Sequence, residues 1–201
     1  MYLVHETLPI TPGRHKAVED RLASGHELMK QLPGFKEAQV CKYLGNTIQY
    51  LAIRRWENEA AFEAWGKSPQ REEYANTRPP GLYTGPPVFL HLEKELETKG
   101  NEGGNFIALN YMDVDANRWP ELVELRKRHD ATAVGVGGVA YIRTYRDAEE
   151  TCKAVSLWRV SGREAIERIG ESAEMEAWRK TIPEGLMHIT TRAFFEAVRE
   201  H

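Results

Sequence analysis

The chain has 201 residues, 28% of them charged and 41% hydrophobic, with a formal net charge of -3. This is an ordinary globular composition, and without a basic cluster there is no electrostatic reason to expect nucleic acid. No apolar run approaches the about 18 residues of a membrane span, and the N-terminus lacks the basic and apolar regions of a signal peptide. The two cysteines lie far apart without metal-type spacing, which predicts a reduced, cytoplasmic protein with no metal site.

The chain begins with a predicted strand followed by a helix. Residues 2–10 are β-rich, and the Pro and Gly that follow at 12–13 end the strand. Val18, Leu22 and Met29 then recur at spacings of four and seven, which is the pattern of one apolar helix face. A Pro-Gly pair after this stretch ends the helix.

A hairpin, a second helix and a last strand complete the first half. Residues 35–44 and 47–56 are strand-like and meet at a Gly-Asn turn. Asn58 is the predicted cap of the second helix. Residues 88–92 alternate between apolar and polar and predict the closing strand.

The second half predicts the same order of elements. Its hairpin precedes a helix whose expected start is a capping box of Ser161 and Glu164. The other expected elements are a strand at 106–114, a helix at 120–128, and hairpin strands at 139–145 and 152–158.

The two halves are expected to be repeats of one unit. A shift of 104 residues pairs Pro79 with Pro183 and Gly81 with Gly185. In the hairpin, pairing Trp56 with Trp158 calls for a gap. The polar, glycine-rich segment at 97–105 predicts a linker. The expected domains are therefore a first repeat at 1–96, this linker, and a second repeat at 106–201.

The order βαββαβ in each half predicts the ferredoxin-like arrangement, in which both helices cover one face of an antiparallel sheet. The other face needs a partner, and fusion supplies a second sheet at high effective concentration. We therefore expect an α+β protein in which two repeats form an intramolecular dimeric α+β barrel. This pseudo-dimer leaves further homo-oligomerisation open.

Three stretches of the first half resemble the antibiotic biosynthesis monooxygenase family of dimeric α+β barrels. The stretches are I-T-P-G at 10–13, L-P-G-F at 32–35 and W-E-N-E-A-A-F-E-A-W-G-K-S at 56–68. The second half resembles the family mainly through the repeat. The family includes cofactor-free oxygenases of aromatic polyketides, quinol oxygenases and haem-degrading enzymes, so the resemblance implies the fold more narrowly than the chemistry.

The resemblance also implies positions for a site. Haem-degrading members use an asparagine on the first strand, a tryptophan in the second helix and a histidine ten residues later. The matching residues are Glu6, Trp65 and Ala75 in the first half, and Asn110, Ile169 and Arg179 in the second. Neither half has the histidine, although seven histidines are present and another ligand is conceivable.

Four polar residues are the candidate catalytic groups. Glu6 and Asn110 could orient a substrate oxygen, and a partly buried Glu6 could act as a base; both could equally be exposed strand residues. His26 and His129, which nearly superpose under the repeat, could serve as bases or ligands. The alternative for each histidine is a boundary residue with a surface hydrogen bond.

Four aromatic residues are the candidate substrate contacts. Trp65 could line a pocket over a flat substrate, or it could be core with Phe62, three residues away on the same helix. Tyr43 and Tyr74 could donate to a substrate oxygen, or simply pack with a hydrated hydroxyl.

The leading functional hypothesis is a monooxygenase-like enzyme for a small, apolar, aromatic or quinol-type substrate, with no metal or flavin cofactor. A haem-binding or haem-degrading protein is the first alternative. A non-catalytic small-molecule-binding or stress-response barrel is the second. The repeat fades where a ligand would sit, so we expect two unequal pockets, with the first half the better candidate for activity.

Overall fold

The computed structural model describes residues 1–200, which form two compact units. Unit 1 contains Met1–Leu92 and the C-terminal residues from Ala197, and unit 2 contains Glu93–Glu196. The strands β4 (Val88–Lys99) and β8 (Met187–Glu200) cross these boundaries, so each contributes to both units. The fold class is confirmed: two ferredoxin-like repeats of the dimeric α+β barrel type.

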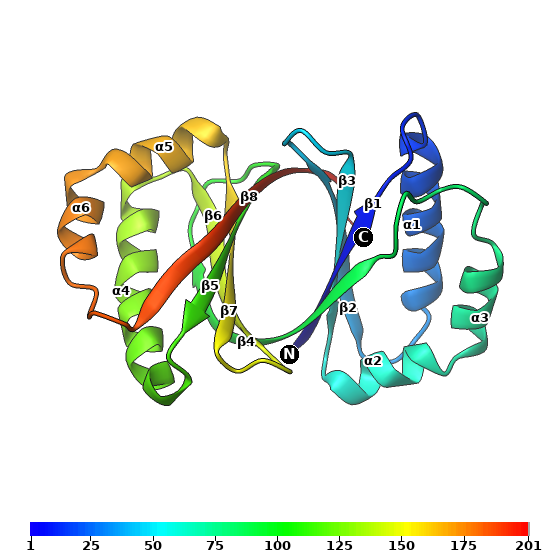
Figure 1. Ribbon diagram of the computed structural model, residues 1–201, viewed down its shortest axis with the longest axis horizontal. Coiled ribbons are helices and arrows are strands. Elements are labelled where there is room, and N and C mark those ends of the chain that lie inside the picture. Colours follow the sequence, from blue (N-terminus) through cyan, green and yellow to red (C-terminus); the bar gives the residue numbers. More distant parts are fainter. Residues whose placement is uncertain (201) are drawn as a thin grey trace. The chain divides into compact units, whose positions relative to one another are not determined.

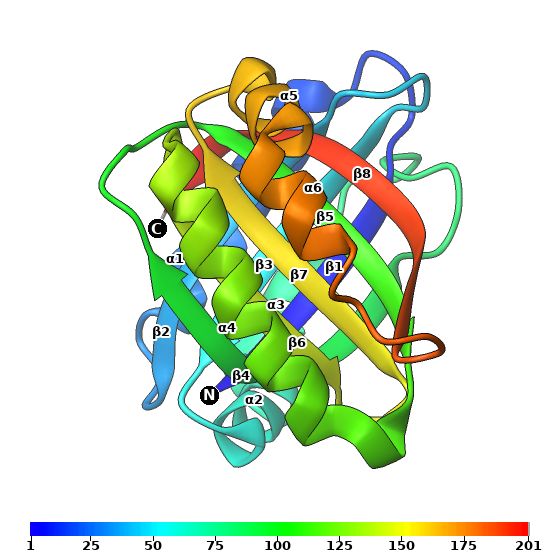
Figure 2. The same ribbon diagram turned by 90° about the vertical axis from the view of Figure 1, so that its left-hand side faces the viewer.

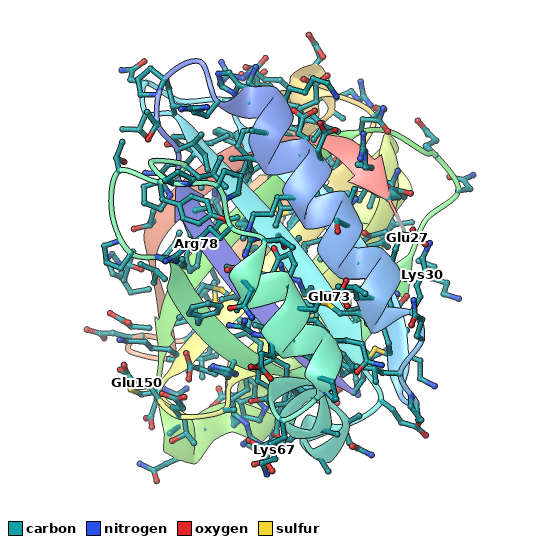
Figure 3. The ribbon with its side chains drawn as sticks, turned by 90° about the vertical axis from the view of Figure 1, so that its right-hand side faces the viewer. Glu27, Lys30, Lys67, Glu73, Arg78 and Glu150 are labelled. Carbon is teal, nitrogen blue, oxygen red and sulfur yellow. The ribbon has the colours of Figure 1, made fainter. Side chains whose placement is uncertain are left out.

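Unit 1 is a sheet with helices on one face (Figure 1). Its strands follow the order β4-β1-β3-β2-β8. Figure 3 shows α1 and α3 side by side over this sheet, with Glu27 and Lys30 near the end of α1. The remaining elements are β1 (Tyr2–Pro9), α1 (His15–Met29), β2 (Phe35–Tyr43), β3 (Gln49–Trp56), α2 (Glu59–Gly66) and α3 (Pro69–Asn76).

Unit 2 repeats this plan, with the strand order β8-β5-β7-β6-β4. Figure 2 shows α4, α5 and α6 on one face of its sheet. A 3-10 turn at Ala116–Arg118 leads into α4. The remaining elements are β5 (Phe106–Val114), α4 (Trp119–Val136), β6 (Val139–Asp147), β7 (Lys153–Val160), α5 (Arg163–Glu171) and α6 (Ala173–Arg179).

The strand registers align the two repeats without a gap, at a constant shift of 104 residues. Tyr2 pairs with Trp56 in unit 1, and Phe106 pairs with Val160 in unit 2, so 106 − 2 and 160 − 56 both equal 104. The bulges in β2 and β6 also fall at equivalent positions. The predicted gap is therefore wrong, and Trp158 corresponds to Arg54 rather than to Trp56, because hydrogen-bond register outweighs the identity of one residue type.

Helix starts differ in part from those predicted. Asn58 caps α2 as expected, accepting from the backbone N–H of Ala61 at 2.9 Å. The capping box is wrong, because Gly162 occupies the cap position of α5 and no side chain caps it. Ser161 precedes the cap residue by one position. Its backbone N–H donates to the carbonyl of Gly138 at 2.9 Å.

The strand β4 continues to Lys99, three residues into the predicted linker. The Glu97 carboxylate contacts the Lys94 ammonium at 2.9 Å and the Arg143 guanidinium at 3.4 Å. These ion pairs give the polar end of the strand partners on its own sheet, which a composition-based prediction does not detect. The exact domain boundaries at 96 and 106 stay predictions.

Two short helices, α3 and α6, do not follow from apolar spacing. Each buries a single residue, Tyr74 in α3 and Met175 in α6. Equivalent serines start them: the Ser68 hydroxyl accepts from the N–H of Arg71 at 3.1 Å, and the Ser172 hydroxyl from that of Met175 at 3.2 Å. Capping, rather than an apolar stripe, therefore defines these helices.

The helix faces also follow the shift of 104. The buried residues of α1 are Val18, Leu22, Gly25, His26 and Met29, and their counterparts Leu122, Arg126, His129, Asp130 and Ala133 are buried in α4. His129 therefore corresponds to Gly25, and His26 to Asp130. The expectation that His26 and His129 nearly superpose is wrong, because their positions differ by one residue under the shift. One residue along a helix turns the side chain by about 100° around the helix axis.

Gly25 is a position on α1 where a side chain would clash with the core. A Cβ built there would lie 2.6 Å from Cε2 of Tyr74. This ring is buried and is held by Arg21, whose guanidinium lies 4.0 Å from the ring centroid. In unit 2 His129 stands at the position equivalent to Gly25, and its ring centroid lies 4.3 Å from that of Trp178, the equivalent of Tyr74.

We expect Gly25→Ala to lower the free energy of unfolding by about 1–3 kcal/mol, because the buried Tyr74 ring must move. The matched control is Gly135→Ala in α4, where a Cβ meets nothing within 4 Å; higher helix propensity should stabilise this variant by up to about 1 kcal/mol. Urea denaturation measures both. Equal stabilisation by both substitutions would contradict the packing of Tyr74 on Gly25.

Candidate functional site

Unit 2 contains a cavity of about 360 Å³ between its sheet and its helices. Strands β5, β7 and β8 form its floor, and α4, α5 and α6 form its walls. The residues lining it are Ala108, Asn110, Arg126, His129, Trp158, Ile166, Ile169, Gly170, Met175, Trp178, Arg179, Ile182, Met187, His188, Ile189 and Arg192. Most are apolar or aromatic, and a few polar groups converge among them, as in many small-molecule sites.

Two tryptophans flank His129 in this cavity. The imidazole centroid lies 5.2 Å from the ring of Trp158 and 4.3 Å from that of Trp178. The indole N–H of Trp158 donates to the hydroxyl of Ser156 at 2.9 Å, and that of Trp178 to the carbonyl of Leu125 at 3.4 Å. The N–H groups of both indoles therefore have hydrogen-bond partners, and the apolar surfaces of the two rings line the cavity.

A buried network of charged groups holds His129 through its Nδ1 atom. The Asp130 Oδ1 atom accepts from Nη2 of Arg126 and from Nδ1 of His129, each at 2.7 Å. Arg126 Nη2 also donates to the Ser156 hydroxyl at 2.8 Å. Because an ionised carboxylate only accepts, Nδ1 carries the proton and Nε2 of His129 is an acceptor.

Burial, together with the positive charge of Arg126, lowers the pKa of His129 from 6.5 to about 4. The carboxylate of Asp130 opposes this shift but does not cancel it. Since Arg126 and Asp130 largely neutralise one another, His129 is a neutral imidazole at physiological pH. It is therefore a hydrogen-bond acceptor and only a weak base before a ligand binds.

Asn110 supplies the polar group on the sheet side of the cavity. It lies on β5 opposite Arg192 of β8, and its Oδ1 accepts from Nε of Arg192 at 2.7 Å. Arginine has no acceptor, so this contact fixes the amide orientation and turns the NH₂ group away from Arg192. Asn110 is 7% exposed.

The equivalent region of unit 1 has a different chemistry. Glu6 corresponds to Asn110, and its Oε2 is 2.5 Å from Nη1 of the buried Arg54. The carboxylate thus has an internal cationic partner. Trp65 is 4% exposed within a core cluster that includes Tyr74 and Phe62.

The other two predicted residues of unit 1 lie on different elements. His26 is fully buried on α1. Tyr43 ends β2 and lines a second cavity of about 240 Å³ beside the hairpin, together with His15 and Lys42. Of the eight predicted site residues, the structure brings only Asn110 and His129 together in the unit 2 cavity; all eight roles stay predictions.

Several cavity residues escape prediction from the sequence. Arg126 and Asp130 interrupt the apolar stripe of α4, although their spacing of four residues places them on one helix face. That spacing, next to a histidine, is the signal that could have identified the network. Trp158 and Arg192 become recognisable only from the strand register.

The fold and this cavity define a ferredoxin-like α+β protein with a cavity between sheet and helices in unit 2. Residues 1–77 match the family described as antibiotic biosynthesis monooxygenase. This match lies within the first repeat, which is similar to the family that the sequence resemblance indicates. No helix within residues 1–200 has the length and apolarity to cross a membrane.

Known proteins similar to this chain include an enzyme and several solved structures. The mycobilin-producing heme oxygenase of Mycobacterium tuberculosis is 26% identical over 93 residues, which cover 46% of this chain and 88% of that protein. A candidate monooxygenase of Fusobacterium nucleatum has a TM-score of 0.77 at 10% identity, covering 100% of this chain and 93% of the other.

Two further structures show the same fold. An anthrone oxidase-like protein has a TM-score of 0.68 at 12% identity, covering 100% of this chain and 92% of the other. The heme-degrading enzyme of Listeria monocytogenes has a TM-score of 0.55 at 9% identity, covering 98% and 99%. At these identities the structures establish the fold alone.

The lowered pKa of His129 predicts a loss of stability in acid. The unfolded chain binds this proton near pH 6.5 and the folded chain only near pH 4, so the contribution is complete above pH 6.5 and disappears as the pH falls towards 4. The free energy of unfolding lost between neutral pH and pH 4 is on the order of 3 kcal/mol. Urea denaturation between pH 7.5 and 4 should show this loss reduced in His129→Gln.

The control for this experiment is His188→Gln, which changes an exposed histidine of the same cavity and should keep the wild-type pH profile. The pKa of buried His5 is also lowered, to about 3, but its contribution is common to all three proteins. Identical profiles for wild type and His129→Gln would contradict a buried neutral His129.

Proposed function

We propose that the unit 2 cavity binds a small, largely apolar aromatic or quinol-type substrate and supports its oxygenation without a metal or flavin. The carrying observation is the convergence of Asn110 and His129 in one cavity walled by Trp158 and Trp178. Its volume of about 360 Å³ lies within the range of small-molecule sites, about 300–1,000 Å³. Flat rings suit such walls because aromatic faces pack in offset or edge-on geometries.

The chemistry follows from a substrate that supplies its own electrons. For an anthrone-type methylene, loss of a proton gives an electron-rich anion that reduces O₂. One oxygen atom becomes the new carbonyl, and the other leaves as water with the two methylene hydrogens. The substrate provides all four electrons, so no further reductant is required.

The residues of unit 2 would promote the first step. His129 presents Nε2 as the proton acceptor, because Asp130 holds Nδ1. A base with so low a pKa needs the developing anion to be stabilised, and the amide NH₂ of Asn110 can donate to it. The anion would also favour a protonated His129 through its opposite charge.

This proposal places the reaction in the second repeat, whereas the sequence favoured the first. In unit 1 the Tyr74 ring packs on Gly25, and Arg54 engages Glu6. In unit 2 the equivalents of Trp65 and Glu6 are the smaller Ile169 and the uncharged Asn110, which leave space and a donor. An open cavity argues against a barrel whose pockets are filled by side chains; a non-catalytic barrel that binds a small molecule would have such a cavity too.

Oxygen uptake with anthrone or 1,4-dihydroxynaphthalene tests the proposal. We expect turnover by the purified chain, with one O₂ consumed for each anthraquinone formed from anthrone. Ile169→Trp should lower turnover at least about tenfold, because it fills the cavity with the residue that unit 1 carries at this position.

The matched control is Ile48→Trp, an exposed position in unit 1, which should keep wild-type turnover. Circular dichroism and the thermal midpoint check that both variants fold. Absence of oxygen uptake with every electron-rich aromatic tested would remove the proposal. So would unchanged turnover in a folded Ile169→Trp protein.

A haem ligand is the second candidate, favoured by the similarity to heme oxygenase and by the orientation of His129. Metal-ligating histidines usually donate their other ring N–H to a carboxylate or carbonyl, as His129 does. The fit is incomplete, because Arg179 stands where the resemblance has the ligand histidine and a guanidinium cannot coordinate iron.

Titration of the protein with haemin separates the two candidates. If haem is the ligand, a shifted Soret band should saturate at one equivalent, and His129→Gln should weaken binding at least about tenfold through loss of the ligand nitrogen. His188→Gln is the control. The absence of a shifted band would exclude haem and leave the oxygenase proposal intact.

A further inference from the structure

The unit 2 cavity is lined by positive charge without a carboxylate among its lining residues. Three arginines, Arg126, Arg179 and Arg192, contribute to the lining, and none of the sixteen lining residues is Asp or Glu. A purely apolar substrate would gain nothing from this arrangement. Cavities lined by one sign of charge concentrate ligands of the opposite sign.

The three guanidinium groups are not equivalent. Arg126 is buried and its charge is offset by Asp130 at 2.7 Å. Arg179 Nη2 donates to the carbonyl of Gly170, and Arg192 Nε donates to Oδ1 of Asn110. Within residues 1–200 neither Arg179 nor Arg192 forms an ion pair, so two charges of the cavity remain without a carboxylate.

The two uncompensated arginines lie on the more exposed side of the cavity, at the end of α6 and on β8. The buried groups Arg126, His129 and Trp158 lie on the inner side. With Nε engaged by Asn110, Arg192 keeps both terminal nitrogens available. A guanidinium presents paired donors that match the two oxygens of a carboxylate.

The charge of Arg179 acts inside the cavity. It contributes to the lowered pKa of His129, after burial and Arg126. Unit 1 has neither cation: on the shift of 104 residues, Ala75 corresponds to Arg179 and Val88 to Arg192. The pair of cations is therefore absent from the equivalent positions of unit 1.

We propose that the substrate is an aromatic carboxylate, bound with its ring between the tryptophan walls and its carboxylate on Arg179 and Arg192. This inference rests on the proposed function and narrows its substrate class. The acid group would fix the orientation of the ring, so that its opposite edge faces His129. Orientation by a charged anchor lowers the entropic barrier of the chemical step.

Calorimetric binding under anaerobic conditions tests this with two matched ligands, 1,4-dihydroxynaphthalene and 1,4-dihydroxy-2-naphthoate. We expect the acid to bind at least about tenfold more tightly, since charge-assisted hydrogen bonds carry this much affinity. Arg179→Gln and Arg192→Gln should each remove about tenfold of the acid's affinity and change that of the neutral ligand less than about twofold. Glutamine at 192 keeps an N–H for Asn110.

The control variant is Lys180→Gln, which removes an exposed cation next to Arg179 that does not line the cavity and should bind both ligands as wild type does. Equal affinity for acid and neutral ligand, unaffected by the arginine variants, would overturn this inference while leaving the proposed function standing.

Two further outcomes are separable. If the acid still binds tightly to Ile169→Trp but not to the arginine variants, the anion site lies outside the cavity and the inference fails. If neither ligand binds and no oxygen is consumed, the proposed function fails as well. Higher turnover of the acid than of the neutral ligand, lost in Arg179→Gln, would support both.

Discussion

The buried ion pair between Arg126 and Asp130 is the interaction on which the unit 2 cavity depends. Both side chains are at most 3% exposed, and Nη2 of Arg126 donates to Oδ1 of Asp130 across one turn of α4. A buried charge without a partner costs several kcal/mol, so neither residue can be changed alone without strong destabilisation. Through Asp130 the pair fixes the orientation of His129, and through Ser156 it connects α4 to the indole of Trp158.

The two repeats solve the same packing problem in different ways. In unit 1 the buried charge lies on the sheet, as Glu6 and Arg54, and the helix above contributes Gly25 and the ring of Tyr74 fills the space. In unit 2 the charge has moved to the helix, and the sheet positions carry Asn110 and Trp158. Moving the ion pair from sheet to helix leaves room between the layers without leaving a buried charge unpaired.

Much of the fold follows from local patterns that the sequence contains. The hairpins, the strand after each Pro-Gly or glycine-rich break, and the Asn58 cap depend on residues within a few positions of one another. Prediction fails where the partner is distant. The end of β4 is polar and resembles a linker, but it lies beside β6 in the sheet, where Arg143 contacts Glu97. Two of the candidate site residues, Asn110 and His129, meet in the cavity; the other six lie in unit 1, where packing or ion pairing engages several of them.

The sequence by itself determined the α+β class, the two repeats and their resemblance to the antibiotic biosynthesis monooxygenase family, because hydrophobic periodicity and turn residues are local signals. Only the tertiary structure brought Asn110 and His129 together in the cavity of unit 2. A shift by one residue along a helix changes the direction of the side chain, so His129 of α4 corresponds to Gly25 of α1 rather than to His26. The strand register, set by hydrogen bonds between distant segments, then places Asn110 beside Arg192.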